Sequence, residues 1–202
     1  MGTTEQSDEK VVYLTLDDGP SKNTQAVLDI LDKYNAKATF FVTGAMPEYK
    51  DMIKKAYDKG HTIGMHTYSH DYAKVYASVD AYFQDLDQIG QLVKEEIGYV
   101  PCFIRFPGGS SNTISASYTK GIMTTLTQEV QARGYQYYDW NGSSGDGSVR
   151  TTEELVAQAT SFDSNNIILL CHDSHGKQTT VEALPQIIEH YQSLGYTFKA
   201  LD

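Results

Sequence analysis

Apolar residues are distributed along the chain in two alternating patterns. Short, nearly continuous apolar runs are typical of buried strands, and longer segments with apolar residues every three to four positions are typical of helices packed on a core. The apolar runs predict strands at 11–16, 38–42, 61–65, 102–106, 135–138, 167–171 and 196–199. The longer segments predict helices at 23–34, 47–59, 78–97, 117–133, 151–161 and 181–194. Because strands and helices alternate from end to end, the chain is expected to form a parallel sheet covered by helices.

Local signals support this segmentation. Thr151 and Glu154 have the spacing of a capping box at the start of a helix. Four glycines follow helical segments, where a left-handed residue commonly ends the helix, and these are Gly60, Gly98, Gly134 and Gly195. At 202 residues the expected fold is a single α/β barrel of about seven parallel strands, closed or nearly closed, in preference to an open doubly wound sheet.

Composition and charge limit the classes of ligand that the protein is expected to bind. With 16 basic and 26 acidic residues the formal charge is -10, which argues against nucleic acid as a ligand. No apolar run approaches the roughly 18 residues that would suggest a membrane span. Residues 11–202 are expected to form the domain, and the polar residues 1–10 are expected to be a linker or a remnant that precedes it.

The chain has two cysteines, Cys102 and Cys171. Both fall in expected buried strands that are not neighbours in the sequence. Strands that are not adjacent are too far apart for a disulfide, so we expect two free, unreactive thiols in the core.

Ionisable side chains lie at or just after the carboxyl ends of five of the expected strands. In parallel α/β barrels the carboxyl ends of the strands carry the chemistry, so these groups are expected to meet at one face. They are Asp17 with Asp18, His66, Arg105, Asp139 with the neighbouring Trp140, and His172. Two adjacent carboxylates repel each other, and one arrangement that keeps them together gives one to a metal and leaves the other as a base. The alternative for Asp17 and Asp18 is a solvated Asp-Asp-Gly-Pro turn.

His66 and His70 are four residues apart, a spacing that on a helical turn places both imidazoles on one side. Together with Asp18 they would give a cation three protein ligands and leave positions open for water and substrate. The alternative is a pair of histidines that line a surface turn. Zinc is the expected metal, and cobalt, nickel or iron also suit these ligands.

The order of these motifs resembles the NodB-type polysaccharide deacetylases, carbohydrate esterase family 4, over nearly the whole chain. The resemblance implies a distorted (β/α) barrel with one catalytic metal. The five matching segments are Asp17-Asp18-Gly19-Pro20, His66 to His70, Arg105-Phe106-Pro107-Gly108, Asp139-Trp140 and Leu170-Cys171-His172.

The resemblance also implies a role for each residue. Asp18, His66 and His70 would bind the metal. Asp17 would be the general base, and Arg105 would pair with it. His172 would protonate the departing amine, with Asp139 orienting its imidazole. The residues that the resemblance implies to contact substrate are Pro107 and Gly108 beside the oxyanion, and Trp140 and Leu170 around the acetyl methyl. Tyr68 is added as a candidate glycan contact because it is an aromatic residue beside the second motif.

Three positions depart from the family pattern. Leu16 stands where an aromatic residue often precedes the first aspartate, and Gly108 stands where some members carry an aromatic residue. Gln136 stands where the fourth motif often has an acid. These departures affect the local packing and hydrogen bonds more than the reaction.

Several residues have two interpretations. Tyr68, Tyr72 and Tyr76 recur every four residues, which suits either glycan contact or a helix packed on the core. His175 is either a further acid or ligand or an ordinary loop residue, whereas we expect His61 and His190 to be structural. The run 141–147 is expected to be a mobile loop that either closes over substrate or connects two elements.

The function implied by the resemblance is hydrolysis of acetyl groups from N-acetylglucosamine in bacterial peptidoglycan. Chitin or its oligomers and acetylated xylan are the alternatives within the family. A catalytically silent glycan-binding module would lack a base, acid or ligand, and a non-haem iron oxygenase would not explain Asp17, Arg105 and His172. A cell-wall substrate implies an extracellular or cell-surface location, with a signal or anchor in the full-length protein.

Overall fold

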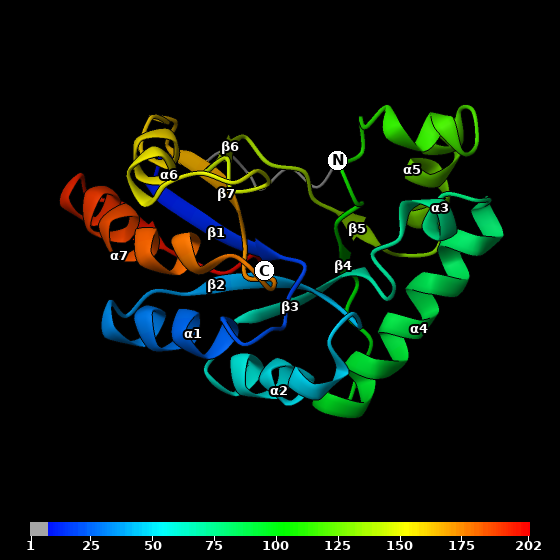
Figure 1. Ribbon diagram of the computed structural model, residues 1–202, viewed down its shortest axis with the longest axis horizontal. Coiled ribbons are helices and arrows are strands. Elements are labelled where there is room, and N and C mark those ends of the chain that lie inside the picture. The colour runs from blue at the N-terminus through cyan, green and yellow to red at the C-terminus, as the bar shows by residue number, and fades with distance from the viewer. Residues whose placement is uncertain (1–7) are drawn as a thin grey trace.

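The computed structural model describes residues 8–202, so residues 1–7 of the expected linker lie outside the described part. A parallel sheet of eight strands forms the centre, in the order β5-β4-β3-β2-β1-β7-β6, with β8 beside β1 (Figure 1). The strands are β1 (Val11–Asp17), β2 (Ala38–Thr43), β3 (Thr62–Thr67), β4 (Phe103–Ile104), β5 (Gln136–Tyr137), β6 (Gly142–Ser143), β7 (Asn166–His172) and β8 (Thr197–Phe198). The sheet curls into a distorted half-barrel, and within residues 8–202 no pairing joins its edge strands β5 and β6.

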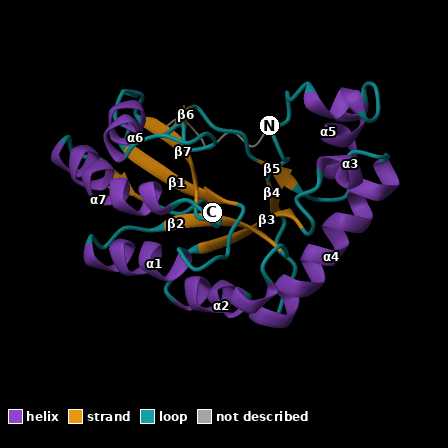
Figure 2. Cartoon of the chain, viewed as in Figure 1, coloured by secondary structure: helices purple, strands orange, loops and turns teal. Residues whose placement is uncertain are grey.

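Helices cover the outer face of this sheet (Figure 2). The α-helices are α1 (Thr24–Lys33), α2 (Asp51–Asp58), α3 (Tyr72–Val75), α4 (Val79–Ile97), α5 (Ile122–Ala132), α6 (Thr152–Ala159) and α7 (Gln178–Ser193). Two short 3₁₀ helices, η1 (Pro47–Tyr49) and η2 (Ile114–Ser117), precede α2 and α5. No helix in residues 8–202 has a stretch both long and apolar enough to cross a membrane.

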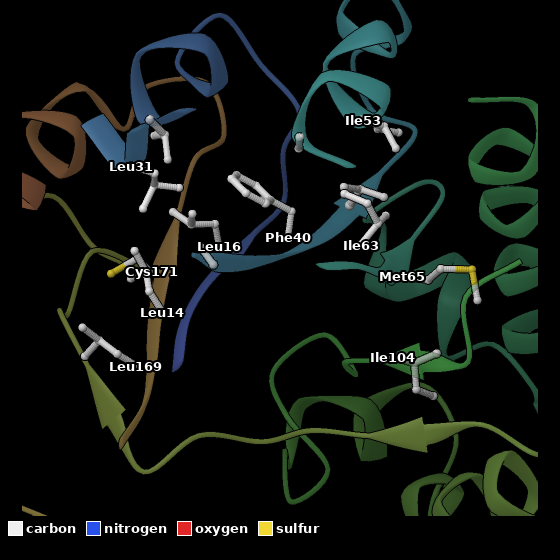
Figure 3. Close-up of a cluster of buried hydrophobic side chains, with 14 of the residues drawn as sticks. Leu14, Leu16, Leu31, Phe40, Ile53, Ile63, Met65, Ile104, Leu169 and Cys171 are labelled. Carbon is white, nitrogen blue, oxygen red and sulfur yellow. The ribbon is translucent and has the colours of Figure 1, made fainter. Parts of the chain in front are cut away.

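The main core lies between the sheet and its helices (Figure 3). Successive side chains of a strand point to opposite faces, so alternate residues of each strand enter this layer. The strand residues drawn there are Leu14, Leu16, Phe40, Ile63, Met65, Ile104, Leu169 and Cys171, and they meet Leu31 of α1 and Ile53 of α2.

A smaller cluster, formed by Phe41, Tyr138 and Leu201 with three partly buried neighbours, is separate from the main core. Thr15, Asp17 and Phe41 alternate with the helix-facing residues of β1 and β2, so they point to the inner side of the curled sheet. Polar, charged and aromatic side chains therefore line the inside of the half-barrel. The candidate functional site lies on this inner side.

The seven expected strands are all present, and β6 is an eighth. The glycine-rich run expected to be a mobile loop contains β6, whose Gly142 and Ser143 pair with Leu169 and Leu170 of β7. An added Cβ at Gly142 would lie 3.1 Å from both Ile167 and Phe162, so a larger residue would require these side chains to shift. No apolar run marked this strand, because its two residues are a glycine and a serine.

The expected helix boundaries hold with local exceptions. The capping box at Thr151 and Glu154 is present, and all four helix-ending glycines have positive φ angles between 83° and 91°. The expected helix 117–133 is interrupted, because Gly121 adopts a left-handed φ of 74° between η2 and α5. The four-residue helix α3 was not predicted.

The two cysteines are free, but only one matches its expected environment. Cys171 is buried in β7, whereas Cys102 is exposed just before β4, so the prediction of two core thiols is wrong for Cys102.

Near the start of the described chain, Lys10 Nζ donates to the Leu194 carbonyl at 3.2 Å and Glu9 pairs with Lys199 at 2.9 Å. Residues 9 and 10 therefore contact the folded domain.

Candidate active site

The first two acids diverge at the carboxyl end of β1. Asp17 is the last residue of the strand and is buried, whereas Asp18 adopts a left-handed φ of 74° in the turn that follows. This uncommon conformation for a residue other than glycine redirects the chain between the two side chains. Two adjacent carboxylates consequently have different partners.

Asp17 is paired with a fully buried arginine. Arg105 Nη1 donates to Asp17 Oδ1 at 2.9 Å and to Thr15 Oγ1 at 2.7 Å. The remaining nitrogens bond to backbone carbonyls, Nε to Tyr138 at 3.0 Å and Nη2 to Asp139 at 3.1 Å. Since the guanidinium is held on three sides, it fixes one Asp17 oxygen and leaves the other, Oδ2, without a donor among residues 8–202.

Asp18, His66 and His70 form a cluster whose ligand atoms all lie within 4.8 Å of one another. The Nε2 atoms of His66 and His70 lie 3.2 Å and 3.0 Å from Asp18 Oδ1. The expected three ligands are thus brought together. The expected helical turn is wrong: His66 is in β3, and His70 is in the following loop with a left-handed φ of 50°.

The protonation of His66 indicates a cation site. His66 Nδ1 lies 2.7 Å from the Arg105 carbonyl, which can only accept, so Nδ1 carries the proton and Nε2 presents its lone pair. That lone pair faces Asp18 Oδ1, a buried oxygen without a hydrogen-bond partner. Burial acts to raise the pKa of Asp18, but hydrogen bonds and positive charge from the two imidazoles, when these are protonated, hold it well below its usual value. Two acceptors that face each other need a cation between them, so the residues fit a divalent metal.

His172 is oriented by an acid that the sequence did not indicate. His172 Nδ1 lies 2.7 Å from Asp146 Oδ1, and the other Asp146 oxygen accepts from the His172 backbone N–H at 2.8 Å and from Thr180 at 2.7 Å. Burial alone would lower the pKa of His172, but the hydrogen bond to Asp146 and the nearby acidic charges raise it to about 9. The imidazole is therefore positively charged at neutral pH.

The prediction that Asp139 orients His172 is wrong. The Asp139 carboxylate accepts from the Ser110 backbone N–H at 2.8 Å and from the Ser110 hydroxyl, so it anchors the loop after β4. The glycine-rich run containing β6 instead carries Asp146 to the imidazole. The only sequence signal was an acid between two glycines, Gly145 and Gly147, in a segment interpreted as a mobile loop.

A cavity of about 310 Å³ joins these groups. It is lined by Asp17, Asp18, His66, His70 and His172, and by three residues predicted to contact substrate, Gly108, Trp140 and Leu170. Tyr72, for which glycan contact was one of two interpretations, also lines it, as do Phe106, Gly147 and Lys177, which were not predicted to. A metal site, a carboxylate paired with arginine and a charged imidazole thus share one solvent-accessible space.

Two residues predicted to contact substrate do not line this cavity. Pro107 is buried, and its carbonyl accepts from the Tyr76 hydroxyl at 2.7 Å. Tyr68 lines a separate surface groove with residues of η1 and α4. Its ring lies over Gly44, where an added Cβ would approach to 2.5 Å. Of the three regularly spaced tyrosines, Tyr72 lines the cavity and Tyr76 is buried in the core.

The remaining histidines lie away from the cavity. His175 is exposed and does not line it. His61 is buried, its Nδ1 accepts from the Ala38 N–H at 3.2 Å, and burial lowers its pKa to about 4. His190 lies in α7 with its ring against Tyr191. Neither residue lines the cavity, and their structural role stays a prediction.

Comparison with known proteins identifies the family. Residues 4–127 match the model of the family described as polysaccharide deacetylase. The catalytic domain of peptidoglycan N-acetylglucosamine deacetylase from Eubacterium rectale ATCC 33656 is 47% identical, with a TM-score of 0.91 over 96% of this chain and 89% of that one. A peptidoglycan-N-acetylglucosamine deacetylase of Bacillus cereus is 31% identical over 96% of this chain and 70% of its own. A bifunctional xylanase/deacetylase of Pseudobutyrivibrio xylanivorans is 33% identical over 98% of this chain and 30% of its own.

The chain belongs to the polysaccharide deacetylase family. It is a metal-dependent hydrolase that acts on carbon–nitrogen bonds, and the Asp18, His66 and His70 cluster is consistent with the divalent metal site of this family. The alternatives of a silent binding module and an iron oxygenase are thereby excluded.

Proposed function

We propose that this protein removes acetyl groups from N-acetylglucosamine residues of peptidoglycan. The observation that carries the substrate is the 47% identity, over 96% of this chain, to the catalytic domain of a peptidoglycan N-acetylglucosamine deacetylase. Such a substrate lies outside the cytoplasmic membrane, so the proposal includes an extracellular or cell-surface location.

Asp17 is the proposed general base. Arg105 keeps its carboxylate paired and correctly aimed, while the free oxygen Oδ2 is available to the cavity. Asp17 accepts the proton of a water as the water oxygen attacks the acetyl carbonyl carbon. The guanidinium also bonds to Thr15 and to two backbone carbonyls, so its position is fixed. The hydrogen bond from this fixed guanidinium holds the Asp17 carboxylate in place.

A divalent metal, zinc in our proposal, would be held by Asp18, His66 and His70, where it would polarise the acetyl carbonyl and acidify the attacking water. The backbone N–H of Gly108, which makes no hydrogen bond within residues 8–202, donates to the carbonyl oxygen as negative charge develops there. Leu170 and Trp140 receive the acetyl methyl in the apolar part of the cavity.

His172 is the proposed general acid. Its Nδ1 proton is held by Asp146, so Nε2 faces the cavity with the proton that the leaving amine needs. The carbon–nitrogen bond breaks as this proton reaches the nitrogen, and the products are acetate and a free amino sugar. Asp146 keeps the imidazole charged until transfer, as its effect on the His172 pKa indicates.

Acetate release tests the proposal. Peptidoglycan, N-acetylglucosamine oligomers and acetylated xylan are compared side by side, with enzyme stripped of metal and then restored with zinc or cobalt. Zinc-dependent release that is fastest from peptidoglycan supports the proposal. Faster release from chitin oligomers or xylan would reassign the substrate, and equal recovery without added metal would contradict the metal centre.

A further inference from the structure

Two consecutive glycines, Gly108 and Gly109, leave space for aromatic residues in the cavity wall. Gly108 and Gly109 both have left-handed φ angles, 78° and 84°. An added Cβ at Gly108 would lie 3.0 Å from Asn112 Cβ and 3.2 Å from the Tyr72 hydroxyl, and one at Gly109 would lie 3.0 Å from the Trp140 ring. The absence of side chains at the two glycines thus leaves room for the Tyr72 hydroxyl and for the Trp140 ring.

Tyr72 is held firmly in this place. It is the first residue of α3, which Asp71 caps by accepting the Ala73 N–H at 3.0 Å. One side of the Tyr72 ring contacts His70 nearly edge-on, at 6.0 Å and 82° between the rings, and another contacts Tyr76 at 5.7 Å. Because the Tyr76 hydroxyl is bonded to the backbone of the loop after β4, the ring position of Tyr72 is set before any ligand enters.

The Tyr72 hydroxyl lacks a partner of its own. It makes no hydrogen bond to any residue in the range 8–202, although the side chain is partly buried at the edge of the cavity. A partly desolvated phenol usually bonds to something, and here the open space beside it is the catalytic cavity. An aromatic face with a hydroxyl edge matches a sugar ring, which offers C–H groups on its face and hydroxyls on its edge.

We propose that Tyr72 is a specificity-determining residue, whose ring forms a wall of the sugar site with Trp140 and whose hydroxyl bonds to a ring hydroxyl of the N-acetylated sugar. The assignment rests on the proposed function. It explains how a chain with Gly108 in place of an aromatic residue keeps an aromatic contact at this point: the ring comes from α3 instead.

The test compares one glycan with one substrate that lacks a sugar. Wild type, Tyr72→Phe and Tyr118→Phe are assayed on an N-acetylglucosamine oligomer and on p-nitrophenyl acetate, and bound zinc is measured for each. Tyr118 is an exposed tyrosine at the end of η2 that does not line the cavity, which makes it the matched control. Tyr72→Phe should lower kcat/KM on the oligomer by roughly 3- to 10-fold, mainly through KM, as expected for one lost hydrogen bond. Its rate on p-nitrophenyl acetate and its zinc content should not change, and Tyr118→Phe should match wild type throughout.

Tyr72→Ala separates the ring from the hydroxyl. It should lower kcat/KM on the oligomer more than Tyr72→Phe does, with zinc still bound. An unchanged oligomer rate in Tyr72→Phe would overturn the proposal, as would equal losses on both substrates with loss of zinc, since Tyr72 would then only support His70. A wild-type enzyme active on p-nitrophenyl acetate but on no acetylated glycan would overturn the proposed function and this inference with it.

Discussion

The Nδ1 nitrogen of His172 lies 2.7 Å from Oδ1 of Asp146, an acid 26 residues earlier in the chain. The family pattern suggested Asp139 for this role, and Gln136 stands where the fourth motif often has an acid. Gln136 Nε2 instead donates to the Tyr138 hydroxyl at 2.7 Å, away from the imidazole. The pair formed by His172 and Asp146 is thus assembled by β6 and the turn after it.

Asp146→Asn should lower kcat by roughly 10²-fold, within the range that general acid catalysis contributes. The pKa of His172 is raised to about 9 chiefly by Asp146, and the acid must be protonated to act. Without that carboxylate the alkaline limb of the kcat–pH profile should move to lower pH. Asp139→Asn is the control, since its carboxylate bonds to Ser110, and an alkaline limb that moved in this variant instead would restore the family assignment.

Asp17→Asn should abolish turnover while one equivalent of metal stays bound, because Asp17 is paired to Arg105 and is not in the ligand cluster. Asp18→Asn should lose the metal as well as the activity. Elemental analysis of both purified variants after dialysis checks this, and metal loss from Asp17→Asn alone would exchange the two roles.

Arg105→Met should lower the free energy of unfolding by about 3–5 kcal/mol, since it leaves the Asp17 carboxylate buried without its cation. Lys54→Met removes an exposed ion pair to Asp58 and should cost less than about 1 kcal/mol. Urea unfolding measures both. Adding Asp17→Asn to Arg105→Met should recover part of the loss, and no recovery would mean that packing, not charge, is responsible.

Asp173 should make stability depend on pH. Burial raises the pKa of its carboxyl to about 7, and the Thr24 hydroxyl bonds to one oxygen while the other has no partner. The pKa of the Asp173 carboxyl is higher in the folded state than in the unfolded state. Its contribution to stability is therefore fully present below about pH 4 and is lost as the pH rises through about 7. Between pH 5 and 8, the free energy of unfolding of wild type should fall by about 2–3 kcal/mol relative to that of Asp173→Asn.

Urea unfolding of metal-free protein at pH 5, 6, 7 and 8 gives the difference between the two curves. Asp87→Asn, which removes an exposed carboxylate on α4, should run parallel to wild type. Parallel curves for Asp173→Asn and wild type would show that Asp173 is ionised throughout this range.

The sequence alone determined the alternation of strands and helices, seven of the eight strands and the residues at their carboxyl ends. These follow from local signals: apolar periodicity defines each strand, glycines end the helices, and parallel pairing brings the strand ends to one face. Asp17, Asp18, His66, Arg105 and His172 could be predicted as a group for that reason.

Only the tertiary structure decided which side chains touch. Three examples depend on loops packed against distant segments. His172 is paired with Asp146, the Tyr72 hydroxyl lies close to Gly108, and Tyr68 lines a groove separate from the catalytic cavity. His70 likewise reaches the metal cluster through a left-handed loop residue, not through helical spacing. Loops have no periodic pattern, and their course is fixed by contacts far away in the sequence, so local signals cannot specify it.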